Sequence, residues 1–501
     1  MARASLFGWL LFFSTMTSVA DEAALESIRI EDLKKHIETL SDDSFEGREA
    51  GSRGGRAAGN YLLQEIQKHK IAGGGENGGY WQYFGDGHRN LLCLIEGADP
   101  QLQGELIIVG GHYDHVGYGT RRNSRGPIGY IHNGADDNAS GVAAMLETLE
   151  ALQKLPENQR PKRSLLFAFW DGEEKGLLGS KHWVAQKTLP DYRVALTINI
   201  DMIGRLRDKV GLEIIGTRTA EGYRRRVSRL NIASDLPLRF PWLLKGNSDH
   251  HSFYTQGMPA LMLHTGLHEE YHRPSDDHHL LNYPGLQKIT QLLFSLVQET
   301  ANADELPGFR ASGRREGALA QRRMEAAQPD PQPRLGVSWE AAEDGAAMIL
   351  KSISPGSPAA VAGLQAGDRI VQFADKPFAN DAELRKRILA SPAETSVTIL
   401  RQGEQEPQPV PLKLRGSPLR IGIAWREDKG EPGTVVVSRV VWGSAAQQAG
   451  LKVRDRIYRI QGERFQDSDE LAEKLRALPA PIELLVERQG RLRKTTLHPL
   501  N

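Results

Sequence analysis

The chain has 501 residues, a length that exceeds one hydrophobic core and predicts about three domains. Apolar residues make up 40% of the sequence and charged residues 25%, as in ordinary globular proteins. The formal net charge is +0, from 63 basic and 63 acidic residues, and this balance argues against a protein whose main partner is nucleic acid or another polyanion.

The first twenty residues predict a targeting segment. Arg3 supplies the positive start, residues 6–13 the apolar centre, and residues 18–20 a small-residue cleavage site. The alternative, a membrane anchor, is disfavoured because the apolar run is much shorter than the ~20 residues that a span needs. We therefore expect a signal peptide at residues 1–20 and an exported protein, periplasmic or secreted, without a stable membrane span.

A single cysteine, Cys93, lies within the apolar run at residues 91–95. One thiol cannot form an internal disulfide, so the exported protein must be held together by its core. A catalytic role is disfavoured, because an apolar strand raises the pKa of a thiol and shields it. We expect Cys93 to be a core residue.

Strands and helices are predicted to alternate over the first 301 residues. Residues 23–69 predict helix with a glycine-rich interruption at 47–59, and the glycine-dense run at 71–79 predicts a loop. Apolar periodicity then predicts strands at residues 90–97, 105–111, 164–169, 194–200, 212–215 and 260–263, and helices at residues 140–155, 180–187, 221–230 and 283–301. The Arg224-Arg225-Arg226 run predicts a solvated helix face. This alternation favours an α/β fold, a mostly parallel open sheet covered by helices.

The last third of the chain contains an internal repeat. Arg-Leu-Gly-Val-Ser-Trp at 334–339 recurs as Arg-Ile-Gly-Ile-Ala-Trp at 420–425, and Gly-Leu-Gln-Ala-Gly-Asp-Arg-Ile at 363–370 recurs as Gly-Leu-Lys-Val-Arg-Asp-Arg-Ile at 450–457. Several matches in one order indicate a duplication. The expected domain boundaries are a signal peptide at 1–20, a first domain at 21–301, a charged, proline-containing linker at 302–333, and two repeats at 334–415 and 416–501.

Polar groups suited to a divalent metal follow four of the predicted strands. The segments are Gly-His-Tyr-Asp-His at 111–115, Asp-Gly-Glu-Glu at 171–174, Ile-Asp-Met-Ile-Gly at 200–204 and Glu-Glu-Tyr-His-Arg at 269–273, with Gly-Ala-Asp-Asp-Asn-Ala-Ser-Gly at 134–141 before the long helix. Ligands of open α/β sheets lie beyond the carboxyl ends of the strands, and imidazoles with carboxylates suit zinc. Each segment alone could be an ordinary surface turn or helix cap, so the prediction depends on their joint arrangement.

The Glu173-Glu174 pair directly follows a buried strand at residues 164–169. Two adjacent carboxylates are costly to hold there unless something binds them. Because neighbouring side chains diverge, one could ligate a metal while the other faces a substrate water. An isolated pair would more simply be a solvated acidic turn, but this pair has His and Asp candidates at other strand ends.

Residues 27–301 resemble the co-catalytic di-zinc aminopeptidases, a family related to glutamate carboxypeptidase and glutaminyl cyclase. The segments quoted above carry the resemblance, extended by Gly-Leu-Leu-Gly-Ser at 176–180 and Tyr-His-Arg-Pro-Ser-Asp at 271–276, and they occur in the family's order. Smaller matches occur at 46–48, 89–90 and 248–250. The resemblance implies an aminopeptidase with two zinc ions as cofactors.

Site residues are carried over by position from this resemblance. His112 and Asp201 are implied as ligands of one zinc, Glu174 and His272 as ligands of the other, and Asp137, three residues before Ser140, as the carboxylate that bridges them. The resemblance also implies a cis peptide bond between Asp137 and Asn138.

Three further residues are given catalytic roles by the same resemblance. Glu173 is the expected general base, which takes a proton from a metal-bridging water. Asp114 is expected to orient the first histidine ligand. Tyr271 is expected to help polarise the scissile carbonyl.

The two repeats resemble PDZ domains of the kind attached to bacterial proteases. The stretches at 335–337 and 421–423 match the loop whose backbone N–H groups receive a peptide C-terminus, so peptide C-termini are expected partners. The alternative is that a repeat only packs on the catalytic domain, and it is favoured for the second repeat, where Arg454 replaces a turn glycine.

The expected function is an exported zinc-dependent aminopeptidase that acts on peptides or proteins with a free N-terminus. The alternatives are a carboxypeptidase or glutaminyl cyclase on the same scaffold, or a non-catalytic peptide-binding protein. The ligand set does not decide which peptide end is read, whereas the intact Glu173 argues against the non-catalytic alternative. Because every expected catalytic residue precedes residue 305, hydrolysis of small substrates is expected to need neither repeat.

Overall fold

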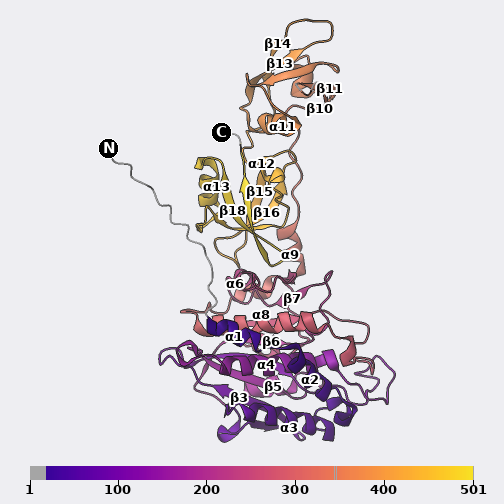
Figure 1. Cartoon of the computed structure of the whole chain (residues 1–501), viewed down its shortest axis with the longest axis vertical. Helices are drawn as coiled ribbons and strands as arrows, with labels where there is room; N and C mark the ends of the chain where they lie inside the picture. Colours follow the sequence, from indigo (N-terminus) through magenta and orange to yellow (C-terminus); the bar gives the residue numbers. More distant parts are fainter. Residues whose placement is uncertain (1–18, 344, 346, 500–501) are drawn as a thin grey trace. The chain divides into compact units, whose positions relative to one another are not determined.

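A computed structural model describes residues 19–343, 345 and 347–499, so residues 1–18 of the predicted signal peptide lie outside the described part of the chain. The chain forms two compact units (Figure 1). Unit 1 contains the residues up to Thr219 and Leu244–Phe309, and unit 2 contains Ala220–Leu243 and Arg310–Asn501. Segment 220–243 therefore belongs to unit 2, although the chain on both of its sides belongs to unit 1.

Unit 1 is built on a mixed sheet. The strands follow the order β1-β3-β5-β4-β6-β9-β7, with β2 paired to β3. Their bounds are β1 Ala72–Gly73, β2 Trp81–Phe84, β3 His88–Ile95, β4 Glu105–His112, β5 Ser164–Trp170, β6 Arg193–Ile200, β7 Leu212–Ile215 and β9 Ala260–His264. The glycine-dense stretch predicted as a loop holds only β1 and the short turn η2 (Glu76–Gly78).

The four central strands, β5, β4, β6 and β9, run parallel to one another. Their carboxyl ends therefore meet at one edge of the sheet. Along β4 and β5 the residues are buried on both faces, which explains their continuous apolar runs. The antiparallel strands β3 and β7 flank this parallel centre.

Helices cover both faces of the sheet. On one face α2 (Ile30–Leu40), α4 (Gly141–Gln153) and α8 (Tyr283–Asn302) pack together. On the other face Trp183 of α5 (Leu178–Ala185) and Phe253 of α7 (His250–Thr255) pack against alternate residues of the central strands. The remaining helices of this unit are α1 (Val19–Glu26) and α3 (Arg53–Lys68), with the short turns η1 (Asp43–Arg48), η3 (Ala135–Ser140), η4 (Glu157–Gln159) and η5 (His278–Leu280).

Unit 2 contains two five-stranded antiparallel sheets, one for each sequence repeat. The first sheet is β10 (Val337–Ala341), β11 (Met348–Ile353), β12 (Arg369–Phe373), β13 (Glu394–Leu400) and β14 (Gln408–Lys413), with helices α10 (Pro358–Val361) and α11 (Asp381–Ala390). The second is β15 (Ile423–Glu427), β16 (Val435–Val440), β17 (Arg456–Ile460), β18 (Ile482–Arg488) and β19 (Arg491–Leu497), with α12 (Ala445–Gln448) and α13 (Ser468–Ala477). Each repeat has its own apolar core. The predicted fold class, an α/β sheet followed by two small β-rich domains, is confirmed.

The region predicted as a linker contains structure of its own. It forms the turn η6 (Ala311–Arg315) and the helix α9 (Ala318–Glu325), which packs on β16 of the second repeat. Segment 220–243 contributes α6 (Tyr223–Leu230) and the short strand β8 (Leu238–Arg239) to the same unit. The prediction that the Arg224-Arg225-Arg226 run forms a solvated face is wrong for Arg224, whose side chain is 12% exposed and pairs with Glu487.

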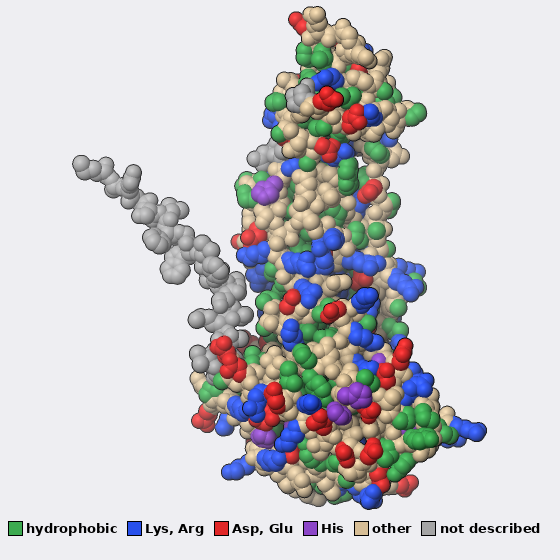
Figure 2. Space-filling model, turned by 45° about the vertical axis from the view of Figure 1, so that its right-hand side comes forward, with side chains coloured by type: hydrophobic (Ala, Val, Ile, Leu, Met, Phe, Trp, Pro, Cys, Tyr) green, Lys and Arg blue, Asp and Glu red, His purple; other side chains and the backbone are tan. Residues whose placement is uncertain are grey.

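Among the described residues, no helix is long and apolar enough to cross a bilayer. On the face of unit 1 drawn in Figure 2, acidic and basic side chains are interspersed, in agreement with the formal net charge of +0.

We expect the thiol of Cys93 to be unreactive in the folded protein. Cys93 is 0% exposed in β3, and burial raises the pKa of its thiol, so little thiolate is available to attack a reagent. Titration with an aromatic disulfide reagent should give no free thiol per chain in buffer and one in denaturant. Rapid labelling of the native protein would contradict the burial of this residue.

Candidate metal centre

Three groups from different elements meet on one side of the candidate centre. His112 ends β4, and its Nε2 lies 3.3 Å from Asp137 Oδ1 and 3.7 Å from Asp201 Oδ1. Asp137 lies in the turn η3 before α4, and Asp201 directly follows β6. All three side chains are buried. They could hold one metal ion.

Four groups meet on the other side of the centre. His272 Nε2 lies 3.1 Å from Asp137 Oδ2 and 3.2 Å from Glu174 Oε2. His115 Nδ1 lies 2.9 Å from Glu174 Oε1. The other ring nitrogen of His272 lies 2.6 Å from the backbone oxygen of Asn123, which fixes the orientation of the ring. Together with Asp137, these side chains could hold a second ion.

Asp137 belongs to both groups. One of its carboxylate oxygens faces His112 and the other faces His272. The ligand atoms within each group lie within 4.8 Å of one another, a spacing that suits tetrahedral zinc. The peptide bond between Asp137 and Asn138 is cis, so this prediction from the family resemblance is confirmed.

The backbone around Asp137 is held by two buried side chains. Asp276 accepts hydrogen bonds from the backbone N–H groups of Asp136 and Asp137, at 3.0 and 3.1 Å. Arg48 is 1% exposed and donates to the backbone oxygens of Asn133 and Gly134 at 2.6 and 2.8 Å. These bonds fix the turn from which the shared carboxylate projects.

Glu173 and Glu174 follow β5 in a tight turn that Asp114 organises. The Asp114 carboxylate accepts from the backbone N–H groups of Glu173 and Glu174, at 3.1 and 3.4 Å. Its distance to His112 Nδ1 is 3.8 Å, too long for a hydrogen bond, whereas the backbone oxygen of Asp114 lies 3.0 Å from that nitrogen. Asp114 therefore contacts His112 through its carbonyl group and the glutamate turn through its carboxylate.

Tyr271 lies next to the second group of ligands. Its ring stacks on His272 with centroids 3.9 Å apart, and the Arg125 guanidinium lies 4.7 Å from the Tyr271 ring centroid. Burial, together with the carboxylates of Asp137 and Glu174, raises the pKa of Tyr271, so the phenol keeps its proton and can donate it in a hydrogen bond.

A hollow of about 490 Å³ is lined by residues that flank Tyr271 and His272 in sequence. Its walls are Arg125, Glu269, Glu270, Arg273 and Ser275. Both signs of charge are therefore available beside the centre for the polar ends of a ligand.

The centre concentrates buried charge. Burial would raise the pKa of Asp137, but the imidazoles of His112 and His272 hold it well below its ordinary value. Burial would lower the pKa of His272, but Asp137 and Glu174 raise it to about 10. Glu173 differs, because burial and the Glu174 carboxylate raise its pKa well above the ordinary value. Glu173 is therefore a carboxylate with a raised proton affinity beside both groups of ligands.

Two residues of the centre were not assigned from the sequence. His115 is buried beside Glu174, and Asp249 is buried near Glu173, whose pKa it raises. Both lay in segments that the sequence singled out, Gly-His-Tyr-Asp-His and 248–250, so residue type and position were the available signals. Nothing in a strand-end pattern distinguishes a second histidine that faces the centre from one that faces solvent.

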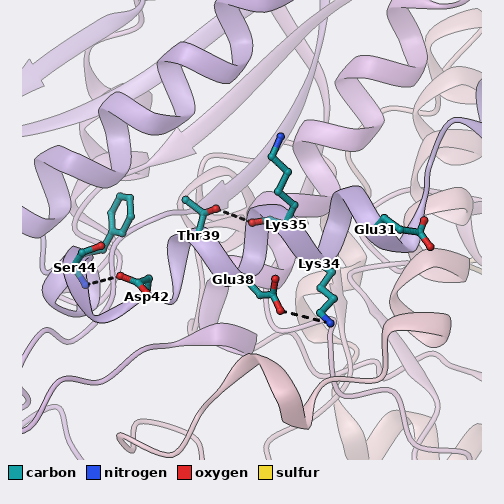
Figure 3. Close-up of a pocket in the computed structure, with 8 residues that line it drawn as sticks. Glu31, Lys34, Lys35, Glu38, Thr39, Asp42 and Ser44 are labelled. Atoms are coloured by element: carbon teal, nitrogen blue, oxygen red, sulfur yellow. Dashed lines mark hydrogen bonds and ion pairs between the residues drawn. The ribbon is translucent and has the colours of Figure 1, made fainter.

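A larger hollow lies along α2, which is distant in sequence from the residues of the candidate metal centre (Figure 3). It measures about 580 Å³ and is lined by Glu31, Lys34, Lys35, Glu38, Thr39, Asp42, Ser44 and Phe45. Several of its side chains are already bonded: Lys34 pairs with Glu38 at 3.6 Å, and Asp42 accepts from the Ser44 N–H. None of the predicted site residues lines it.

Residues 90–297 match Peptidase family M28, and residues 349–402 and 436–488 each match the PDZ domain. These matches confirm the resemblance predicted from the sequence for the first domain and for both repeats.

Curated relatives match parts of the chain. A probable zinc metalloprotease of Pyrenophora tritici-repentis is 31% identical over 206 residues, which are 36% of this chain and 44% of that protein. Leucine aminopeptidase 1 of Arthroderma gypseum is 25% identical over 296 residues, which are 56% of this chain and 77% of that protein. The crystal structure of the Legionella pneumophila LapA aminopeptidase aligns with a TM-score of 0.48 and 20% identity over 57% of this chain and 75% of that chain. The chain spans only 44% and 50% of the two Pyrenophora metalloproteases that it matches.

We expect Gly134→Ala to weaken metal binding strongly. Gly134 has a φ of +56°, and a Cβ there would lie 2.2 Å from the Asp137 backbone oxygen and 2.5 Å from the His115 ring, so the shared carboxylate must move. Gly129→Ala is the matched control, because Gly129 has a φ of +82° in the same region of sequence but no neighbour within 4 Å. Zinc content after dialysis against a chelator should fall for Gly134→Ala alone. Equal losses of zinc in both variants would show that backbone strain at a positive φ, and not a clash with Asp137 or His115, causes the effect.

Proposed function

We propose, on the premise that residues 90–297 are a peptidase family M28 domain, that the chain is a zinc-dependent aminopeptidase. The observation that supports this best is the Asp137 carboxylate, whose two oxygens face two different sets of metal-binding side chains. An arrangement of this kind suits a pair of metal ions that share one carboxylate. His112 and Asp201 would hold one zinc, and Glu174 and His272 the other.

Zinc bound by these residues would supply a Lewis acid that polarises a carbonyl and lowers the pKa of a coordinated water. The protein supplies the proton transfers. Glu173 is the general base, because its raised pKa lets it accept a proton from the attacking water and return it to the departing amine. Tyr271, a neutral phenol beside His272, would donate a hydrogen bond to the scissile carbonyl.

The excess of carboxylates at the centre favours a cationic substrate end. Asp201 and Asp249 are buried there, with Glu173 beside them, and a protonated N-terminal amine would compensate part of this negative charge. This is the physical reason to prefer the N-terminus of a peptide as the end that is read. His115 would position Glu174 through the 2.9 Å contact between Nδ1 and Oε1.

A carboxypeptidase is the second candidate, and a specific observation favours it. The Arg125 guanidinium over the Tyr271 ring is a cation beside the centre that could bind the C-terminal carboxylate of a peptide.

The first PDZ domain is the better candidate for binding peptide C-termini. Its loop contains Gly336, with a φ of +79°, and β10 forms one edge of the sheet. A peptide strand could pair with that edge beside α11. Export through the signal peptide at residues 1–20, to the periplasm or the exterior, completes the proposal.

Peptides that differ only in their blocked end distinguish the two candidates. We expect turnover of aminoacyl anilides and of C-terminally amidated peptides, and no turnover of N-acetylated peptides, because acetylation removes the ammonium group. Arg125→Ala should leave anilide turnover within a few fold. Cleavage of N-acetylated peptides that disappears in Arg125→Ala would support the carboxypeptidase instead.

Glu173→Gln and Glu174→Gln should have different effects. Glu173→Gln removes the proton acceptor, so kcat should fall by ~10²–10⁴-fold while the zinc content and KM change little. Glu174→Gln should lose one zinc ion, since an amide is a poor zinc ligand. Metal analysis and kcat on both variants test this division, and a reversed result would exchange the two roles.

A further inference from the structure

Segment 220–243 connects two parts of the unit that holds the metal centre, yet it packs into the unit that holds the PDZ domains. It carries seven buried apolar side chains, 0–6% exposed: Ala220, Tyr223, Val227, Leu236, Leu238, Phe240 and Trp242. A chain cut after residue 305 would lack the second PDZ domain against which this segment packs.

The first turn of α6 is bound by a turn of the second PDZ domain. The Glu431 carboxylate, 1% exposed, accepts hydrogen bonds from the backbone N–H groups of Arg224 and Arg225, at 2.8 and 3.3 Å. The Gly222 N–H donates to the Gly430 backbone oxygen at 3.0 Å. A carboxylate there also compensates the positive end of the helix dipole.

A buried ion pair fixes the same helix. Arg224 donates to both oxygens of Glu487 at 2.9 and 3.1 Å, and its guanidinium lies 4.4 Å from the Phe240 ring centroid. Glu487 is 0% exposed and also accepts from the Tyr458 hydroxyl at 3.3 Å. The attraction between two buried charges offsets the free-energy cost of their desolvation only when their geometry is good. The pair therefore specifies the position of α6 on the second PDZ domain.

The turn between β18 and β19 fits against the rest of the segment. The Leu238 N–H donates to the Gln489 backbone oxygen at 2.9 Å, and the Asn231 amide donates to the Gly490 backbone oxygen at 3.0 Å. A Cβ on Gly490 would lie 2.4 Å from the Leu238 Cβ. The close contact between this turn and Leu238 therefore requires glycine at position 490.

This surface is separate from the expected peptide groove, which lies between β15 and α13. The contacts of the segment are made by the turn at 430–432 and by β18 and β19. The second PDZ domain therefore binds a part of its own chain without using the site at which PDZ domains receive a peptide C-terminus.

The segment ends immediately before a wall of the metal centre. Ser248 accepts a hydrogen bond from the Asn199 side-chain amide of β6 at 2.7 Å. Asp249 and His250 are 0% exposed and directly follow Ser248, whose partner Asn199 stands two residues before Asp201 in the chain. Only residues 244–247 separate this wall from the segment.

We infer that the second PDZ domain is an internal clamp: it holds segment 220–243 and, through it, keeps residues 248–250 in place beside the metal centre. The consequence for turnover rests on the aminopeptidase function proposed above. The clamp itself does not, because it is a property of the folded chain.

Gly490→Ala tests the clamp from the PDZ side and Arg224→Ala from the segment side, both in the full chain with zinc. Gly462→Ala is the matched control, since Gly462 has a φ of +77° in the same domain, close to the +75° of Gly490, but no neighbour within 4 Å. Arg401→Ala, which removes an arginine paired with the buried Asp368 in the first PDZ domain, controls for the loss of an ion pair elsewhere in unit 2.

Hydrogen exchange of segment 223–243 should accelerate by about 10²–10³-fold in Gly490→Ala and Arg224→Ala, as for loss of one partner of a buried pair. Hydrogen exchange of α7 should accelerate together with that of the segment. The kcat/KM for an aminoacyl anilide should fall by about 10²-fold, because residues 248–250 are misplaced beside the metal centre. Zinc content should not change, and the two controls should behave as the unaltered protein.

Unchanged exchange of segment 223–243 in both test variants would overturn the clamp. Faster exchange there with unchanged exchange of α7 would overturn its link to the metal centre. If the unaltered protein does not hydrolyse aminoacyl anilides, only the proposed function is contradicted. The exchange measurements on the segment and on α7 need no enzymatic activity and still test the clamp.

Discussion

The candidate metal centre of unit 1 depends on the position of one carboxylate, that of Asp137, between two histidines. Its Oδ1 lies 3.3 Å from His112 Nε2 and its Oδ2 lies 3.1 Å from His272 Nε2, so one residue links groups from opposite ends of the domain sequence. Asp276 and Arg48 bind the backbone of the turn that carries it. These bonds hold the backbone from which the shared carboxylate projects between both sets of ligands.

The parallel centre of the sheet brings these groups together at an energetic cost. Asp137, Glu173, Glu174 and Asp201 are carboxylates in a largely dry place, where unpaired negative charges are strongly unfavourable. Histidines offset part of this repulsion, and a pair of divalent cations would offset a further part. Burial and the neighbouring Glu174 carboxylate raise the pKa of Glu173, so the cost of gathering the carboxylates would also prepare the proposed general base.

The duplicated PDZ domains have diverged in their packing. Gly367 of the first repeat and Arg454 of the second occupy the same turn, both with positive φ, at 91° and 77°. An arginine is unfavourable in that conformation, but its Nε lies 3.4 Å from the backbone oxygen of Glu325, at the end of α9. The substitution therefore belongs with the contacts that bind the second domain to α9 and to segment 220–243, whereas the first domain keeps the glycine.

The fold class, the duplication and the residue types of the centre could be predicted from the sequence, because apolar periodicity and strand-end motifs are local patterns. Tertiary structure decided which side chains face the centre: His115 contacts Glu174 only because β4 and β5 are parallel neighbours. It also decided the environment of Arg224. A run of arginines on a helix is the same local pattern whether it faces solvent or a buried glutamate 263 residues later, and only the folded chain supplies that glutamate.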